Sequence, residues 1–193
     1  TASTGATINW YSTPTGGAPI GTGTSFTTPV ITATTDFYAA ASNGGSTIQG
    51  GKPSTNGADG TNTTGGIFFT ANQAFTLNSV VMYPTTAGTN RINLYPGTST
   101  SGAPILFIDI PFAGAAPGGV VVPIGWTIPP GDYTIYQSSG SSNCWRDFLS
   151  ATPATSFPYN IGSACILTGS TVDGFYYFFY NWNISPLCEG NRT

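Results

Sequence analysis

The chain has 193 residues, of which only 6% are charged, and its formal net charge is −3 with no histidine. Lys52 is the only lysine, so the chain has no run of cations that could neutralise nucleic-acid phosphates or bind an anionic membrane. No apolar run approaches the roughly 20 residues of a membrane-spanning helix, and since the chain begins at Thr1 without a signal peptide, we expect a mature or excised fragment.

The composition favours an all-β fold. Hydrophobic residues make up 39% of the chain and aromatic residues 13%, which is enough to fill a core. Threonine and aromatic residues suit strands, while the 26 glycines and 15 prolines suit turns. No stretch places helix-forming residues at a 3.6-residue period, so we predict no long helix.

The opening part of the chain alternates as a half-buried strand does. In residues 6–11, Ile8 and Trp10 fall on one face and the polar side chains on the other. A turn at 13–17 follows, and we predict further short strands at 25–29 and 35–41. These few short strands make too little core for a stable domain, so this part must borrow strands or lean on a neighbour.

Residues 42–64 lose their hydrophobicity and predict a loop or linker. Beyond them, strands separated by turn signals predict a sandwich or a jelly roll. The strands that we expect are 66–69, 75–83, 91–95, 105–112, 119–124, 133–137, 143–148, 165–168 and 175–182. The last of these is aromatic on both faces, so it must be central or have one face covered by a loop.

Two stretches resemble the immunoglobulin-like (Ig-like) repeats of Bacteroidetes cell-surface adhesins, some of which are linked to gliding motility. The first reads Ile8-Asn9-Trp10-Tyr11 with Gly16-Gly17, then Phe26-Thr27-Thr28-Pro29 and Asp36-Phe37-Tyr38. The second is the ending Cys188-Glu189-Gly190-Asn191-Arg192, in which Gly190 replaces the usual serine. The segment between them resembles the β-sandwich that is often inserted in such repeats.

The resemblance implies an Ig-like β-sandwich carrying an inserted, larger, jelly-roll-like antiparallel sandwich. Residues 1–44 plus 183–193 would form the Ig-like domain, with its first strand upstream of the fragment, and residues 45–182 would form the insert. Insertion is sterically easy when the termini of the inserted domain lie close together.

The three cysteines indicate a disulfide in an oxidising compartment better than a metal site, since no CxxC motif or histidine accompanies them. The resemblance places the partner of Cys188 outside the fragment, which leaves Cys144 and Cys165 as the expected internal disulfide. The rival pairing joins Cys165 to Cys188.

The sequence predicts that the chain is not an enzyme. Without histidine there is no Ser-His-Asp or Cys-His arrangement. A glycosidase would need two carboxylates at a set separation, but the seven acids are scattered, at Asp36, Asp59, Asp109, Asp132, Asp147, Asp173 and Glu189. An isopeptide cross-link is not expected either, because Lys52 lies in a Gly/Pro loop.

No cofactor or metal is expected, and a structural calcium ion is only an alternative to plain turn chemistry in one loop. Asn56, Asp59 and Asn62 share one loop and carry the oxygen ligands that calcium prefers. The alternative is that all three only make turn hydrogen bonds.

The strongest ligand-binding candidates are Trp145, Arg146, Asp147, Tyr159 and Asn160. They place aromatic rings, a bidentate donor, a carboxylate and an amide near a Ser/Gly loop, as carbohydrate sites do. The alternative is structural: Trp145 belongs to the core, Arg146 pairs with Asp147 or with backbone carbonyls, and Tyr159 packs.

Two functions follow. The first is a structural and adhesive repeat of a large secreted adhesin on the bacterial cell surface, with neighbouring repeats of the same chain and surface glycans as its partners. The second is a carbohydrate-binding module of a secreted protein or hydrolase.

Overall fold

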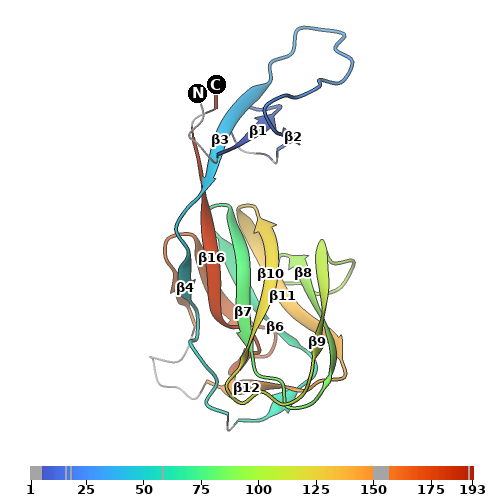
Figure 1. Ribbon diagram of the computed structural model, residues 1–193, viewed down its shortest axis with the longest axis vertical. Coiled ribbons are helices and arrows are strands. Elements are labelled where there is room, and N and C mark those ends of the chain that lie inside the picture. The colour runs from blue at the N-terminus through green and yellow to red at the C-terminus, as the bar shows by residue number, and fades with distance from the viewer. Residues whose placement is uncertain (1–5, 16, 18, 58, 150–156, 191) are drawn as a thin grey trace. The chain divides into compact units, whose positions relative to one another are not determined.

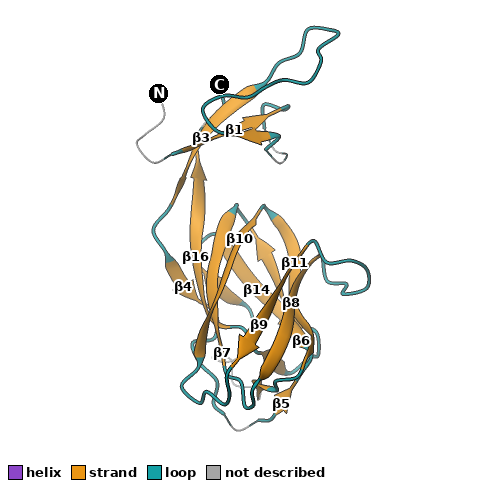
Figure 2. Ribbon diagram, turned by 45° about the vertical axis from the view of Figure 1, so that its right-hand side comes forward, coloured by secondary structure: helices purple, strands orange, loops and turns teal. Residues whose placement is uncertain are grey.

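A computed structural model describes residues 6–15, 17, 19–57, 59–149, 157–190 and 192–193, without the side chains of residues 43, 188 and 189. The described residues form antiparallel strands and no helix, which confirms the all-β class (Figure 2). This part of the chain therefore holds no apolar helix that could cross a membrane. The chain divides into two compact units, which we call unit 1 (residues 1–46 with 186–193) and unit 2 (residues 47–185).

Unit 1 is a small sheet to which both ends of the chain contribute. Its strands, in spatial order, are β2 (Gly21–Thr22), β1 (Thr7–Tyr11), β3 (Tyr38–Gly44) and the end of β16 (Tyr180–Glu189) (Figure 1). Ala39 and Thr193 exchange two backbone hydrogen bonds of 3.0 Å. The Arg192 guanidinium lies 3.4 Å from the centre of the Tyr11 ring. The opening and closing segments therefore share one sheet.

Residues 25–29, predicted as a strand, take no part in strand pairing. Ring contacts hold Phe26 instead, because its centroid lies 5.7 Å from that of Trp10 and 5.6 Å from that of Phe37. The Trp10 indole N–H in turn donates to the carbonyl of Gly23 at 2.9 Å. The apolar signal at Phe26 thus reflects aromatic packing, and the strand prediction is wrong there.

Unit 2 consists of two packed sheets with a third at one end. The first sheet has the order β4 (Ile48–Gly50), β16, β7 (Phe75–Met82) and β10 (Val120–Ile128). The second has the order β13 (Tyr159–Ile161), β14 (Cys165–Ser170), β6 (Gly65–Ala71), β11 (Gly131–Gly140), β8 (Gly88–Pro96) and β9 (Leu106–Phe112). The third is β15 (Phe175–Tyr177), β12 (Cys144–Phe148) and β5 (Thr61–Asn62).

The strand order of the two large sheets is that of a jelly roll. The strands β4, β6, β7, β8, β9, β10, β11 and β16 follow one another along the chain. One sheet holds β4, β16, β7 and β10, which are the first, eighth, third and sixth of these strands. The other holds β6, β11, β8 and β9, which are the second, seventh, fourth and fifth. This alternation is how two Greek keys close into a double sheet. The predicted jelly-roll-like sandwich is therefore confirmed.

The core of unit 2 lies between the two large sheets. Alternate residues of β10 are buried, as expected for a strand that has one face in the core and the other exposed to solvent. Across the sheets, the Phe69 ring of β6 meets the Trp182 ring of β16 edge-on, with centroids 5.2 Å apart. One cluster of buried residues draws side chains from both layers.

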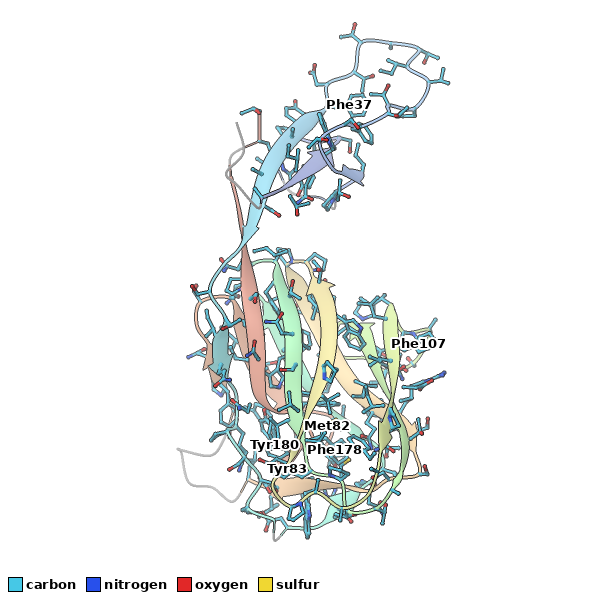
Figure 3. All side chains as sticks on the ribbon, in the orientation of Figure 1. Phe37, Met82, Tyr83, Phe107, Phe178 and Tyr180 are labelled. Atoms are coloured by element: carbon cyan, nitrogen blue, oxygen red, sulfur yellow. The ribbon has the colours of Figure 1, made fainter. Side chains whose placement is uncertain are left out.

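The aromatic run 175–182 is two strands, not one. Phe178, which follows the end of β15, has a φ angle of 46°, and Asn181, near the start of β16, has one of 41°. Both lie in the left-handed region, so the backbone changes direction here. The Phe179 carbonyl accepts hydrogen bonds from the Trp182 indole at 2.7 Å and the Tyr176 hydroxyl at 2.9 Å. Figure 3 shows Phe178 and Tyr180 gathered with Tyr83 and Met82 at one end of the unit.

The expected disulfide between Cys144 and Cys165 is not formed, and both thiols are free and buried. Cys165 pairs with Ala71, the last residue of β6, whereas Cys144 pairs with Asn62, before β6 begins. The strand β6 alone spans about 20 Å, and a disulfide needs Cα atoms within about 7 Å of each other. Because Cys165 is free, the rival pairing with Cys188 is wrong as well.

Candidate functional site

The surface of the second sheet that turns away from the core carries a group of aromatic and polar side chains, which we call the outer face. Strand alternation produces it: Ile92 and Leu94 are buried in the core, so the residues between and beside them point the other way. The outer face consists of Arg91, Asn93 and Tyr95 on β8, Phe107 and Asp109 on β9, and Tyr136 on β11.

Strand register brings these side chains together. Arg91 lies opposite Asp109, and Asn93 lies opposite Phe107 on β9 and opposite Tyr136 on β11. Residues directly opposite on neighbouring strands have Cβ atoms about 5 Å apart. The register therefore makes one patch from three segments of the chain.

A two-pronged ion pair stands at one side of the outer face. The Arg91 Nε and Nη2 atoms donate to Asp109 Oδ1 and Oδ2 at 2.8 and 2.7 Å. The hydrogen bond from Arg91 lowers the pKa of Asp109, and the carboxylate raises the pKa of Arg91. The guanidinium also lies 4.5 Å from the centre of the Phe107 ring. The pair therefore fixes the cation against the ring.

The middle of the outer face holds a polar side chain with an unused acceptor. Asn93 is only 3% exposed, and its Nδ2 donates to the Tyr95 hydroxyl at 3.2 Å. Its Oδ1 is buried and accepts no hydrogen bond from the described residues. The ring of Tyr136 meets that of Tyr95 edge-on, with centroids 6.4 Å apart. An unpaired buried acceptor costs about 1–3 kcal/mol, and solvent does not reach this one.

These groups can recognise an uncharged polyhydroxylated ligand. The Phe107 side chain is 57% exposed and offers a ring at the edge strand (Figure 3). Carboxylate, guanidinium and amide groups are planar donors and acceptors that suit paired hydroxyls. An apolar surface with a few oriented polar groups is the usual composition of a small-ligand site.

The residues predicted from sequence for ligand binding lie elsewhere in unit 2. Trp145 is half-buried against the core. The Arg146 guanidinium lies 4.0 Å from the centre of the Phe175 ring and donates to the Tyr177 hydroxyl at 2.9 Å. Both side chains thus have extensive contacts within the protein.

Asp147 is fully buried and has internal partners at both oxygens. Its Oδ1 accepts hydrogen bonds from Thr55 Oγ1 at 2.6 Å and from the Asn56 amide at 3.1 Å. Its Oδ2 lies 2.7 Å from Lys52 Nζ. We call Lys52, Thr55, Asn56 and Asp147 the buried ion-pair site.

Tyr159 packs close to this site, whereas Asn160 does not. The ring of Tyr159 meets that of Tyr176 edge-on at 5.4 Å, and burial, together with the charge of Asp147, raises the pKa of Tyr159. Asn160 is exposed on β13. The structure therefore brings Asp147 and Tyr159 together but does not join all five residues in one surface. Their role in ligand binding stays a prediction.

The three calcium candidates make turn and loop contacts. Asn56 Nδ2 donates to Asp59 Oδ2 at 2.6 Å, and the same oxygen accepts the backbone N–H of Phe148 at 2.8 Å. These two hydrogen bonds lower the pKa of Asp59. Asn62 Oδ1 accepts the N–H of Thr63 at 2.8 Å. The described residues hold no cluster of three or more Asp, Glu, Cys or His that could bind a metal.

The outer face was not among the sites predicted from the sequence. Its signal was present in the alternation of Arg91-Ile92-Asn93-Leu94-Tyr95, where polar and aromatic side chains interrupt buried aliphatic ones. What the sequence did not provide was the register that places Phe107 and Tyr136 on either side of Asn93.

Comparison with known proteins identifies one similarity. Residues 1–53 match a family model described as an Ig-like domain, CHU_C associated. This match, of a Bacteroidetes-type domain, supports an Ig-like surface-protein domain in that part of the chain. Comparisons with curated proteins and with solved structures found no significant match.

Proposed function

We propose that the chain is an adhesive module of a large bacterial surface protein, in which unit 2 binds a glycan and unit 1 serves as the Ig-like spacer. The Ig-like match over residues 1–53 supports a surface location outside the cell. Neighbouring modules of the same protein and surface polysaccharides are the expected partners.

The outer face is the observation that carries this proposal. It combines an exposed aromatic ring at Phe107 with the fixed ion pair of Arg91 and Asp109 beside it. A sugar ring presents an apolar face that stacks on an aromatic side chain, and hydroxyls that pair with planar polar groups. Both features lie on the paired strands β8 and β9.

We infer that the module binds its ligand and does not turn it over. Four of its carboxylates have partners of their own: Asp109 with Arg91, Asp147 with Lys52, Asp132 with the Thr70 hydroxyl, and Asp59 with the Asn56 amide. A general acid or base must be free to contact the substrate. These four carboxylates are therefore better placed to hold their neighbours in position than to exchange a proton with a substrate.

The outer face also suits a carbohydrate-binding module of a secreted hydrolase. The two functions differ in the ligand: an adhesin would bind glycans of a cell surface, and a hydrolase module would bind the polysaccharide that its enzyme cleaves. A ligand panel that contains both kinds separates them.

The test is a glycan array probed with the 193-residue chain and with its Phe107→Ala variant. We expect saturable binding that the substitution weakens at least tenfold, because the stacking ring is lost. The matched control is Phe148→Ala, since Phe148 is 53% exposed, similar to Phe107, but lies on β12. The proposal fails if the array shows no binding, or if both variants lose it equally.

A further inference from the structure

The buried ion-pair site brings the only lysine of the chain against a carboxylate that solvent does not reach. Lys52 Nζ lies 2.7 Å from Asp147 Oδ2, and the exposed fractions of the two side chains are 15% and 1%. The residues are 95 positions apart in the sequence, on the loop after β4 and on β12. The loop after β4 thus packs against β12, so the loop position of Lys52 does not keep it from contacting Asp147.

The surroundings of the pair are aromatic. The Lys52 ammonium lies 5.8 Å from the centre of the Tyr180 ring, and the Lys52 backbone N–H donates to the Tyr176 hydroxyl at 3.3 Å. Tyr176 and Tyr180 are both fully buried. The aromatic rings therefore shield the ion pair from water.

The other oxygen of Asp147 is polarised. The Thr55 hydroxyl and the Asn56 N–H both donate to Oδ1, at 2.6 and 3.1 Å. Two donors converging on one carboxyl oxygen stabilise the negative charge that develops there when a nucleophile adds to the carbon. Meanwhile Lys52 Nζ donates to the Ser54 carbonyl at 2.9 Å, which orients the amine and can accept hydrogen bonding from a product N–H.

We propose that Lys52 and Asp147 are the substrates of an autocatalytic reaction that joins them by an isopeptide bond. A proton moves from Nζ to Oδ2 across the 2.7 Å contact. The neutral amine then adds to Cγ, and Thr55 and Asn56 stabilise the charge on Oδ1. The Cγ–Oδ2 bond breaks, one of the two protons left on the nitrogen transfers to the departing oxygen, and one water leaves while the other proton stays on the amide. The product is an amide between Nζ and Cγ, and no oxidant or co-reactant is consumed.

Proximity supplies the driving force that the same reaction lacks in water. Two groups held in contact behave as if at very high concentration, with effective molarities that reach about 10⁵ M or more. The bond would tie the loop after β4 to β12 covalently. It would thus do the work of the disulfide that the free thiols of Cys144 and Cys165 do not form.

The test is the intact mass of the folded 193-residue chain. The cross-linked chain is expected to weigh one water, about 18 Da, less than its sequence. Trypsin should then release residues 1–91 joined to residues 147–192, because cleavage sites flank Asp147 at Arg146 and Arg192. In Lys52→Arg, which keeps the positive charge but offers no primary amine, the full mass should return and the joined peptide should disappear.

Two results overturn the proposal. One is a wild-type mass equal to that of the sequence, in a preparation whose near-ultraviolet circular dichroism shows a packed core. The other is a loss of one water that persists in Lys52→Arg, since it must then arise elsewhere in the chain. Thr55→Val provides a further check: it keeps the size of the side chain but removes a donor to Oδ1, so the cross-link should form at least tenfold more slowly.

Discussion

The ring of Tyr136 lies over Gly66, its cross-strand partner on β6: a Cβ at Gly66 would come within 2.8 Å of Tyr136 Cδ2. Gly66 thus leaves room for an aromatic side chain of the outer face to rest on the sheet itself. The local sequence choice on one strand sets the position of a binding side chain on the next.

Gly66→Ala should therefore destabilise unit 2. The added methyl group would collide with the Tyr136 ring and with the Ile135 carbonyl, and overpacking of this kind costs about 1–3 kcal/mol in the free energy of unfolding. Chemical denaturation monitored by tryptophan fluorescence measures the change. Gly114→Ala is the control, because a Cβ there meets nothing within 4 Å; equal effects of the two substitutions would refute the packing argument.

The Phe179 carbonyl predicts a non-additive pair of substitutions. It accepts hydrogen bonds from both Trp182 and Tyr176, so either Trp182→Phe or Tyr176→Phe leaves it one donor. The double variant leaves a buried carbonyl without a partner, which costs about 1–3 kcal/mol beyond the sum of the single variants. A double-mutant cycle on the free energy of unfolding tests this, and simple additivity would contradict it.

The stability of the fold should decrease at alkaline pH. Burial raises the pKa of the Cys144 and Cys165 thiols from 9.0 to about 12. The thiols lose their protons at a lower pH in the unfolded chain than in the folded one. Above pH 9 the unfolded state therefore binds fewer protons, and the free energy of unfolding falls. The contribution is fully present below pH 9 and is lost as the pH rises towards 12. Burial also raises the pKa of Tyr176 and Tyr180, which adds to the decline above pH 10.

Urea midpoints measured between pH 8 and pH 11 test this dependence. In the variant Cys144→Ala with Cys165→Ala the decline should be shallower, because two of the titrating groups are gone. A midpoint that is independent of pH over this range would contradict the burial of the thiols.

The two thiols should also be protected from reagents while the chain is folded. Cys144 and Cys165 are both 0% exposed and free, so a thiol reagent should modify them only after denaturant is added. A background of Cys188→Ala keeps the third cysteine from contributing. Failure to titrate two thiols in denaturant, without a reductant, would mean that a disulfide exists after all.

The ion pair on the outer face should matter for binding and hardly at all for folding. Arg91 and Asp109 are each 45% exposed, and exposed pairs contribute little to stability because water screens them. The double variant Arg91→Ala with Asp109→Ala should leave the thermal midpoint nearly unchanged while it weakens glycan binding. A large drop in the midpoint would assign the pair a structural role instead.

The sequence predicted the class of the fold and most of the strands, because alternation and turn residues are local signals. The predicted strand 75–83, for example, appears as β7 over Phe75–Met82. Errors arose where tertiary contacts override a local pattern. Phe26 packs against rings and joins no strand, and the left-handed backbone at Phe178 splits a continuous aromatic run.

The candidate site could be predicted only in part, because it depends on pairing between distant segments. Nothing local to Lys52 indicates that its loop reaches Asp147, and nothing local to Phe107 indicates that Asn93 lies opposite. The disulfide prediction failed for the same reason: residue spacing does not show that Cys165 pairs with the end of β6 while Cys144 pairs with β5, before β6 begins.

Binding of a glycan by the outer face is the claim on which the account depends most. The direct measurement is isothermal titration of the 193-residue chain with the best oligosaccharide from the array, alongside Phe107→Ala and the exposed-aromatic control Phe148→Ala. We predict a saturable isotherm that Phe107→Ala weakens at least tenfold and that Phe148→Ala leaves unchanged. Equal affinity for wild type and Phe107→Ala would place the ligand elsewhere and contradict the assignment.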